Sequence, residues 1–130
     1  MKYLAQSLAL LGALALTVPA PAQASDETPQ AFEKATDAAQ DAQADMFNTF
    51  GKDELGNGQF LWKDGADEVT RVVVSLPDQM VYAYDGSNLV GVASVSTARK
   101  GYITPTGIFE VLSKDRDYRS KKFNDAPMPF

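Results

Sequence analysis

The sequence has 130 residues, of which 45% are hydrophobic and 22% are charged, and its formal net charge is −5. This length and composition fit one soluble globular domain and leave no room for two full ones. The sequence contains no Cys and no His. It therefore excludes, within these residues, disulfides, thiolate or imidazole metal sites, Cys or His nucleophiles and every His-dependent triad.

Residues 1–24 have the organisation of a secretory signal peptide. Lys2 provides a positive n-region, residues 4–18 form an uncharged run, and Ala22-Gln23-Ala24 is the small-x-small pattern that precedes a cleavage site. A membrane anchor is the alternative, but the run is shorter than the roughly 20 apolar residues that span a bilayer. We expect cleavage before Ser25 and an exported protein without a stable membrane span, periplasmic if the source is a Gram-negative bacterium.

Charge divides the remaining chain into two blocks. Residues 25–68 contain three Lys against eleven Asp and Glu, whereas residues 69–130 contain eight Lys and Arg against six acidic residues. An acidic chain lacks the basic stripe that neutralises phosphates, so we expect no nucleic-acid partner. The basic run at residues 116–122 is interpreted as a solvated loop.

The acidic block begins with a predicted short acidic α-helix. Thr28 suits the N-cap, Pro29 suits the first helical position, and Gly51 suits the end of the helix. One apolar stripe follows the helical period: Phe32, Ala35, Ala39, Ala42 and Met46. Charged and polar residues are expected off this stripe: Glu33, Lys34, Asp37, Gln40, Asp41 and Asp45. A stripe made mostly of alanine buries little area, so the helix should dock weakly, act as a spacer, or bind an envelope protein partner.

Residues 51–68 are rich in glycine and scattered acids, which is typical of a linker. Phe60, Leu61 and Trp62 are its one apolar patch, and this patch could hold the linker against the domain. The expected organisation is therefore a signal peptide (1–24), an acidic helix with linker (25–68), and a β-rich domain (69–130).

From residue 69 the pattern changes to extended structure. Residues 69–75 contain three consecutive valines, a composition expected of a strand that is buried on both faces or packed inside a small sandwich. Residues 80–84 and 89–96 flank the turn formers of residues 85–88, which predicts a hairpin. Residues 108–112 are a fourth predicted strand. The preceding Thr104-Pro105-Thr106-Gly107 predicts an irregular turn, because proline lacks a donor and glycine tolerates positive φ.

In order and spacing, these segments resemble the first half of the L,D-transpeptidase (YkuD-type) catalytic domain. The resemblance rests on residues 72–84, Leu89-Val90, Val95-Ser96-Thr97, residues 104–109 and Met128-Pro129-Phe130. It covers about half of the family's domain. One departure is Ala98, which stands where the family often has Gly. The implied fold class is mainly β: an incomplete L,D-transpeptidase-like β-sandwich, preceded by the signal peptide and the short acidic helix.

The resemblance implies an enzyme that remodels peptidoglycan. In this family a Cys attacks the bond between the third and fourth residues of a stem peptide, and an amine resolves the resulting thioester. That chemistry needs a thiolate activated by His and backbone donors for the oxyanion. The family carries its His and Cys in later elements that these residues do not include, so we assign no catalytic residue and expect the chain as given to be inactive.

Two explanations account for the missing residues. In the first, the sequence is the N-terminal piece of a longer domain, because it stops inside the Met-Pro-aromatic element without a closing helix or cap. In the second, it is a degenerate, non-catalytic envelope module that binds peptidoglycan or a protein partner through the sheet. We favour the first, since half a sandwich exposes strand edges and half a core. A chance match of an exported structural protein is a third, weaker hypothesis.

Two residues are candidates for substrate binding, on the strength of the resemblance. Met128 and Phe130 lie in an element that borders the donor-peptide cleft in the family, although an ordinary core role is the competing interpretation. The turn at residues 104–107 is expected to be structural. The acids of residues 115–125 alternate with Lys and Arg, which indicates solvated salt bridges, each contributing about 0–1 kcal/mol. We assign no metal and no cofactor, and peptidoglycan stem peptides are the expected partners.

Overall fold

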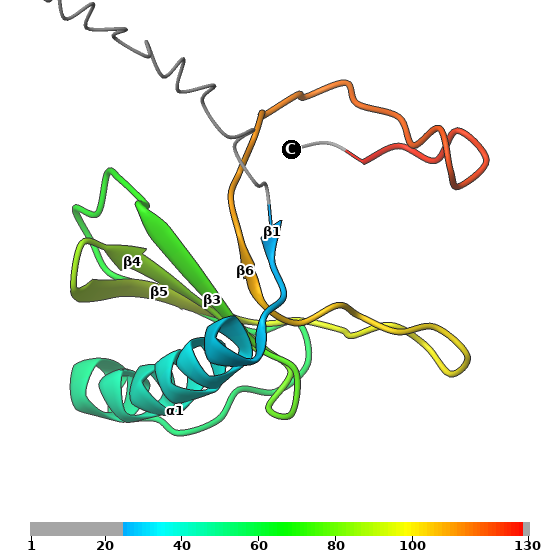
Figure 1. Cartoon of the computed structure of the whole chain (residues 1–130). Coiled ribbons are helices and arrows are strands. Elements are labelled where there is room, and N and C mark those ends of the chain that lie inside the picture. Colours follow the sequence, from blue (N-terminus) through cyan, green and yellow to red (C-terminus); the bar gives the residue numbers. More distant parts are fainter. Residues whose placement is uncertain (1–24, 129–130) are drawn as a thin grey trace, which may run out of the picture.

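The computed structural model describes residues 25–128 and consists of one helix and two antiparallel sheets (Figure 1). The larger sheet has the strand order β2-β5-β4-β3, and the smaller one pairs β1 with β6. The fold is mainly β, as predicted. The bounds are β1 (Ser25–Asp26), α1 (Pro29–Phe50), β2 (Phe60–Trp62), β3 (Arg71–Ser75), β4 (Met80–Asp85), β5 (Asn88–Ser94) and β6 (Ile108–Phe109).

The helix α1 begins and ends where the sequence predicts. The Thr28 side chain accepts a hydrogen bond from the Ala31 N–H at 3.2 Å, and Pro29 occupies the first turn. At the other end Gly51 adopts the left-handed conformation with φ 67°, and its N–H donates to the Phe47 carbonyl at 2.9 Å. Such a glycine satisfies a carbonyl that the helix end would otherwise leave without a partner. Among residues 25–128, no helix combines the length and apolarity required to cross a membrane.

The hairpin of β4 and β5 is the centre of the larger sheet. Its strands are joined at Gly86 and Ser87, with Asp85 opposite Asn88, and a bulge shifts the register between Ala83 and Tyr84. The strand β3 pairs along the other side of β4. Three of the four predicted strands therefore form, although β3 begins at Arg71 and β5 ends at Ser94.

One face of this sheet packs against α1 and forms the core. Because side chains alternate along a strand, every second residue of β3 and β4 points toward the helix. The buried core cluster contains Ala42, Met46, Val73, Met80, Tyr82, Tyr84, Leu89 and Val92. The helix is thus the covering layer of the sheet, as Figure 1 shows, rather than a detached spacer.

The opposite face of the sheet is apolar and open. Val72 and Val74 are 54% and 51% exposed, whereas Val73 between them is 9% exposed. Val72 stands opposite Ala83, and Val74 stands opposite Val81, so neither has a charged cross-strand neighbour. On this side of the neighbouring strands Phe60 and Trp62 are also exposed. A valine run suited to burial on both faces has, within the described residues, a covering layer on one face only.

Two expectations for the helix stripe are wrong. Phe32 is exposed, and Ala31 takes the buried position at the start of the helix. Asp45, expected off the stripe, is half-buried and accepts a hydrogen bond at 2.9 Å from the Tyr84 hydroxyl. The alanine-rich face is broad, so the sequence period alone did not fix which edge of it meets the sheet.

The expected linker contains a strand. Residues Phe60–Trp62 form β2, which pairs with β5 and extends the sheet. The Trp62 ring lies directly over Gly91, where any Cβ would collide with it. The apolar patch does hold this segment against the sheet, and it does so through backbone pairing, which sequence periodicity over three residues cannot reveal.

The fourth predicted strand is shorter than expected and lies elsewhere. Only Ile108–Phe109 is extended, and it pairs with Ser25–Asp26 instead of joining the larger sheet. Gly107 has φ 148°, and a Cβ there would lie 2.5 Å from the Asp26 carbonyl oxygen. Glycine is therefore required at the end of the predicted turn, both for its backbone conformation and for this close approach.

Candidate functional site

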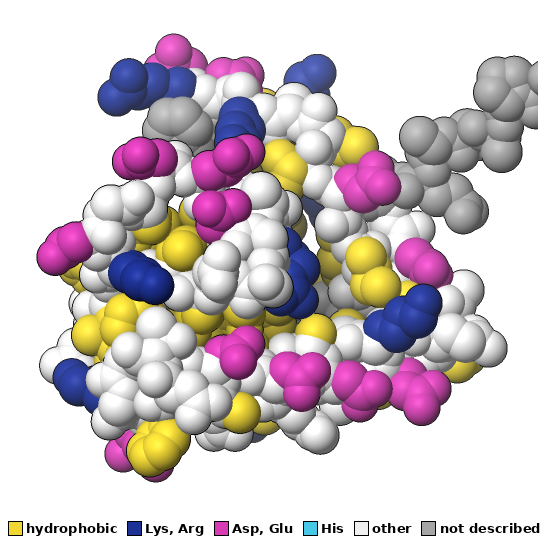
Figure 2. Space-filling model, turned by 90° about the vertical axis from the view of Figure 1, so that its left-hand side faces the viewer, with side chains coloured by type: hydrophobic (Ala, Val, Ile, Leu, Met, Phe, Trp, Pro, Cys, Tyr) yellow, Lys and Arg dark blue, Asp and Glu magenta, His cyan; other side chains and the backbone are white. Residues whose placement is uncertain are grey.

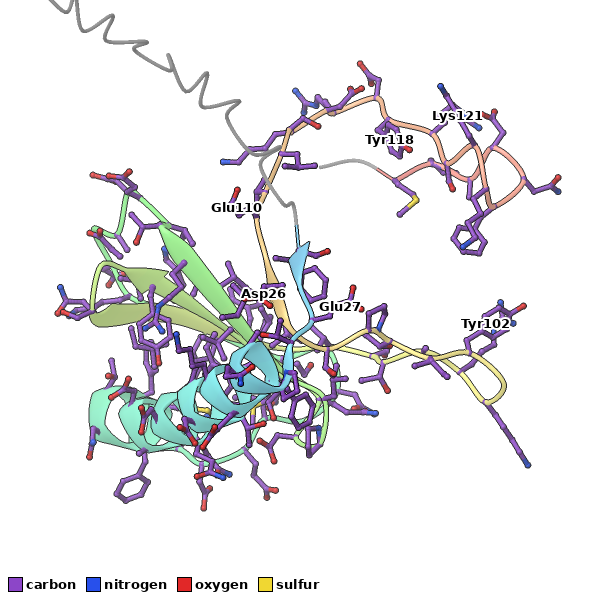
Figure 3. All side chains as sticks on the ribbon, viewed as in Figure 1. Asp26, Glu27, Tyr102, Glu110, Tyr118 and Lys121 are labelled. Atoms are coloured by element: carbon purple, nitrogen blue, oxygen red, sulfur yellow. The ribbon has the colours of Figure 1, made fainter. Side chains whose placement is uncertain are left out.

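The segment that carries Met128 folds back on itself as a small exposed loop. The Met128 N–H donates to the Tyr118 carbonyl at 2.9 Å, and Arg119 forms an isolated antiparallel bridge with Pro127. Ser120 is buried at the centre of the loop, where its hydroxyl accepts from the Phe123 N–H at 3.1 Å. In Figures 1 and 3 this loop stands apart from the sheet and helix, with Tyr118 and Lys121 on it.

The structure describes one of the two candidate substrate residues. Met128 is 49% exposed and its side chain belongs to no core cluster. Phe130 lies outside the described residues, as do residues 1–24 with the predicted signal peptide and cleavage site. Met128 is thus accessible to a ligand, and its role in substrate binding stays a prediction.

An exposed ion pair joins two charged residues of this loop. The Arg119 Nε lies 2.7 Å from the Asp125 Oδ2, and both side chains are largely exposed. The Asp115 carboxylate accepts from the Asp117 N–H at 3.0 Å. The Arg119–Asp125 contact is a surface ion pair of the expected kind, which contributes about 0–1 kcal/mol, whereas the Asp115 contact is a hydrogen bond to the backbone.

A pocket of about 390 Å³ lies where α1 meets β3 and the hairpin, far along the chain from Met128. Asp37, Asp41 and Asp45 line it from the helix, and Arg71 and Tyr84 line it from the sheet. The Arg71 guanidinium stacks 4.2 Å from the centre of the Tyr84 ring. Burial, and then the hydrogen bond to Asp45, raise the pKa of Tyr84 far above its usual range. The tyrosine therefore stays neutral and acts as a donor, which is a structural role.

A neighbouring tyrosine has no such partner. Tyr82 is fully buried, its hydroxyl makes no hydrogen bond, and burial together with the charge of Asp78 raises its pKa. A smaller pocket of about 210 Å³ lies near the same strand, lined by Gln43, Asp53, Glu54, Asp78 and Met80. Over residues 25–128 no group of three or more acidic side chains is arranged to hold a metal ion.

Nucleophilic chemistry finds no activated group in the described residues. Ser94 accepts a hydrogen bond from the Gly58 N–H at 2.8 Å, and Ser75 donates to the Asp78 carboxylate at 2.6 Å. Neither contact supplies the imidazole base that a serine nucleophile needs at neutral pH, and the sequence contains no His.

Comparison with known proteins identifies the C-terminal part of the chain. Residues 69–130 match the family model of the L,D-transpeptidase catalytic domain (YkuD). No curated protein and no solved structure matches the chain significantly. This match and the mainly β fold are consistent with a partial L,D-transpeptidase catalytic domain over these residues.

Sequence reasoning missed the polar cluster at the helix–sheet contact. The signal was present in part: Asp37, Asp41 and Asp45 recur every fourth residue and so share one side of a helix. Arg71 and Tyr84 could not be joined to them from the sequence, because their meeting depends on how the helix docks.

Proposed function

We propose that the chain supplies the first half of an exported L,D-transpeptidase catalytic domain that cross-links and remodels peptidoglycan and so maintains cell shape. The family match over residues 69–130 carries this proposal. The proposal includes cleavage before Ser25 and delivery to the periplasm or cell envelope. It treats residues 25–68 as a preceding segment whose helix and strand pack onto the catalytic-domain portion.

The chemistry follows the family and uses groups outside this sequence. A Cys in the rest of the domain attacks the stem-peptide bond between residues three and four, the terminal residue leaves, and an acceptor amine then displaces the thioester. A His accepts the thiol proton and orients the reaction. The present residues contribute the sheet scaffold, and Met128 and Phe130 border the donor peptide.

The open face of the larger sheet supports a division of the domain into two halves. Val72, Val74 and Trp62 expose apolar surface on that face. The residues paired opposite the two valines are also apolar. Contiguous apolar surface of this kind is normally covered in a soluble protein. A second layer of strands from the remainder of the domain would cover it and complete a sandwich.

The decisive experiment compares the chain with a completed domain. Residues 1–130 are followed, in one reading frame, by a second half of an L,D-transpeptidase domain that carries the family's His and Cys. We expect the completed protein to release the terminal residue from a tetrapeptide stem and to form a carbapenem adduct. The 130-residue chain alone should do neither. A Cys→Ala version of the completed protein is the control.

A role for Met128 is tested in the same completed protein. Replacement Met128→Ala should raise KM for the tetrapeptide donor by about threefold to tenfold, because an apolar contact of this size is worth about 1 kcal/mol.

A carbapenem-sized mass on the 130-residue chain would overturn the proposal. So would a completed protein that folds and remains inactive, in which case the non-catalytic envelope module, with α1 as a partner-binding helix, is the better assignment.

A further inference from the structure

Residues 95–107, called here the finger, project from the sheet as a long two-armed loop (Figure 1). Its base is held by Gln79, the turn residue just before β4. The Val95 N–H donates to the Gln79 carbonyl at 2.8 Å, and the Gln79 side-chain amide donates to the Thr97 hydroxyl at 3.3 Å. The two arms are joined by the Ala98 N–H, which donates to the Thr104 hydroxyl at 3.1 Å. The finger is therefore supported along its length.

The tip of the finger exposes apolar and aromatic surface. Gly101 has φ 93°, and the Tyr102 N–H closes the turn on the Arg99 carbonyl at 3.0 Å. Ile103 is 92% exposed and Tyr102 is 64% exposed. Figure 3 shows Tyr102 close to the end of the projection, away from the helix and the sheet.

The charge of the finger is opposite to that of the chain as a whole. Its charged residues are Arg99 and Lys100, and it contains no acidic residue in a protein of net charge −5. The Arg99 guanidinium lies 5.9 Å from the centre of the Tyr102 ring, so a cation and an aromatic face are presented together. On another face, by contrast, Asp and Glu side chains lie beside Lys and Arg with apolar side chains visible between them (Figure 2).

We propose that the finger is a docking site for an acidic glycopeptide, with Arg99 and Lys100 binding carboxylates and Tyr102 packing on a sugar ring. This inference rests on the proposed function, which makes the peptidoglycan of the envelope the source of that ligand. Its stem peptides carry free carboxylates, and its glycan strands present sugar rings with apolar faces. Guanidinium and ammonium groups bind carboxylates through charge-assisted hydrogen bonds, and an aromatic ring offers the flat partner.

An anionic lipid surface is the competing ligand, and the finger fits it less well. Stable attachment of a protein to a bilayer needs a large buried apolar area or two independent anchors. The finger offers one short tip with two cations, which provides neither of these. A rigid polymer whose acidic repeats lie close together requires only the small site that the tip provides.

The test measures how much of the full chain sediments with purified, insoluble peptidoglycan beyond the amount that sediments without it, at several salt concentrations. We expect binding that weakens with salt, because exposed charges are screened. The variant Arg99→Glu/Lys100→Glu should lower binding at least about fivefold, and Tyr102→Ala about threefold. The control Lys52→Glu/Lys63→Glu makes the same change in net charge outside the finger and should bind within about twofold of the parent. Circular dichroism checks that all variants keep the helix.

Two further arms identify the ligand chemistry. Peptidoglycan whose carboxylates have been converted to amides should lose the Arg99- and Lys100-dependent binding. The proposal is overturned if finger variants bind like the parent, if the parent does not bind, or if it binds phosphatidylglycerol vesicles in preference to peptidoglycan. If binding depends on the finger but the completed domain is inactive, the docking proposal stands and the transpeptidase proposal fails. If the completed domain is active but binding does not depend on the finger, the transpeptidase proposal stands and the docking proposal fails.

Discussion

At the scale of single residues, two tyrosines on β4 differ in one hydrogen bond. Tyr82 and Tyr84 lie on the same side of the strand and both are fully or almost fully buried. The Tyr84 hydroxyl donates to Asp45 at 2.9 Å, whereas the Tyr82 hydroxyl has no partner. A buried polar group without a partner costs about 1–3 kcal/mol, and a hydrogen bond to a charged group contributes about 1.5–3 kcal/mol. The two hydroxyls should therefore act on stability with opposite signs.

Replacing each tyrosine with phenylalanine tests this difference. We expect Tyr82→Phe to leave the helix–sheet unit unchanged or more stable by up to about 1 kcal/mol. Tyr84→Phe should destabilise it by about 1–2 kcal/mol, because the half-buried Asp45 loses its donor. Amide exchange of β4 and β5 gives the comparison in one protein background. Equal effects of the two replacements would show that the hydrogen bond to Asp45 is not formed.

The raised pKa of Tyr84 has a consequence at high pH. The folded state holds this phenol neutral well above its ordinary pKa near 10, because ionisation would bury a charge beside Asp45. The unfolded chain loses the proton first, so this contribution to stability is complete below about pH 10 and declines as pH rises above that value. Tyr84→Phe should reduce the alkaline loss of helix signal, followed by circular dichroism from pH 9 to 12. An unchanged alkaline transition would contradict the assignment.

At the scale of elements, the ribbon of β1 and β6 connects the start of the helix to the segment that leads to Met128. The Asp26 carboxylate accepts from the Thr28 N–H at 3.0 Å, and Thr28 in turn caps α1. Hydrogen bonding to Thr28, by its side chain and then by its N–H, lowers the pKa of Asp26. Because this pairing covers only two residues of each strand, we expect it to be sensitive to the close approach of Gly107 to the Asp26 carbonyl.

Gly107→Ala should open this ribbon. A methyl group would lie 2.5 Å from the Asp26 carbonyl oxygen, and φ 148° is unfavourable for alanine. We expect a local cost of about 1–3 kcal/mol, seen as faster amide exchange at residues 25–26 and 108–109 with β4 and β5 unaffected. Gly101→Ala is the matched control, because it also has positive φ but no atom within 4 Å of the added Cβ. Gly101→Ala should leave exchange at the ribbon unchanged, and a Gly107→Ala protein with equally unchanged exchange there would contradict the close approach to Asp26.

Successive valine side chains of β3 point to opposite faces of the sheet. Val73 faces the helix and is buried, while Val72 and Val74 face the open side. The double replacement Val72→Lys/Val74→Lys should reduce self-association in sedimentation measurements while keeping the fold, because it charges an exposed apolar face. Val73→Lys should unfold the unit, since a charge would be buried without a partner. A chain that associates as strongly after the double replacement must use another surface.

Elements with a strong local signal were predictable from the sequence, and those made by long-range pairing were not. The caps Thr28 and Gly51 and the hairpin turn at residues 85–88 depend on local chemistry, and the structure confirms them. The strand β2 and the displaced β6 depend on partners 29 or more residues away, so short runs of residues could not reveal them. Among the polar residues, the surface pairing of Arg119 with Asp125 agrees with expectation, the role of Met128 in substrate binding stays a prediction, and the Asp45–Tyr84 contact required the docked helix.

At the scale of the whole molecule, charge and apolar surface are distributed unevenly. The helical half is acidic and the segment from residue 69 is mildly basic. The core unites α1 with the four-stranded sheet, whereas apolar residues after β6, such as Val111 and Leu112, remain exposed. Native proteins typically have a free energy of unfolding of only about 5–15 kcal/mol. Because this margin is small, an uncovered apolar sheet face should reduce stability noticeably.

The stability of residues 25–130 in isolation depends on how much apolar surface they bury. Their core unites only α1 with the four-stranded sheet, one sheet face is open, and apolar residues after β6 are exposed, so they bury less surface than a closed domain of the same length. We expect this chain to be partly unfolded or associated, with the strongest amide protection in the β4–β5 hairpin, where pairing is most extensive. Extension through a second half of the domain should cover Val72 and Val74 and produce one cooperative unfolding transition. A sharp, reversible and concentration-independent transition of residues 25–130 alone, with protection across β3 and β2, would instead indicate a self-sufficient unit, and the non-catalytic envelope module would then explain the open face as a binding surface.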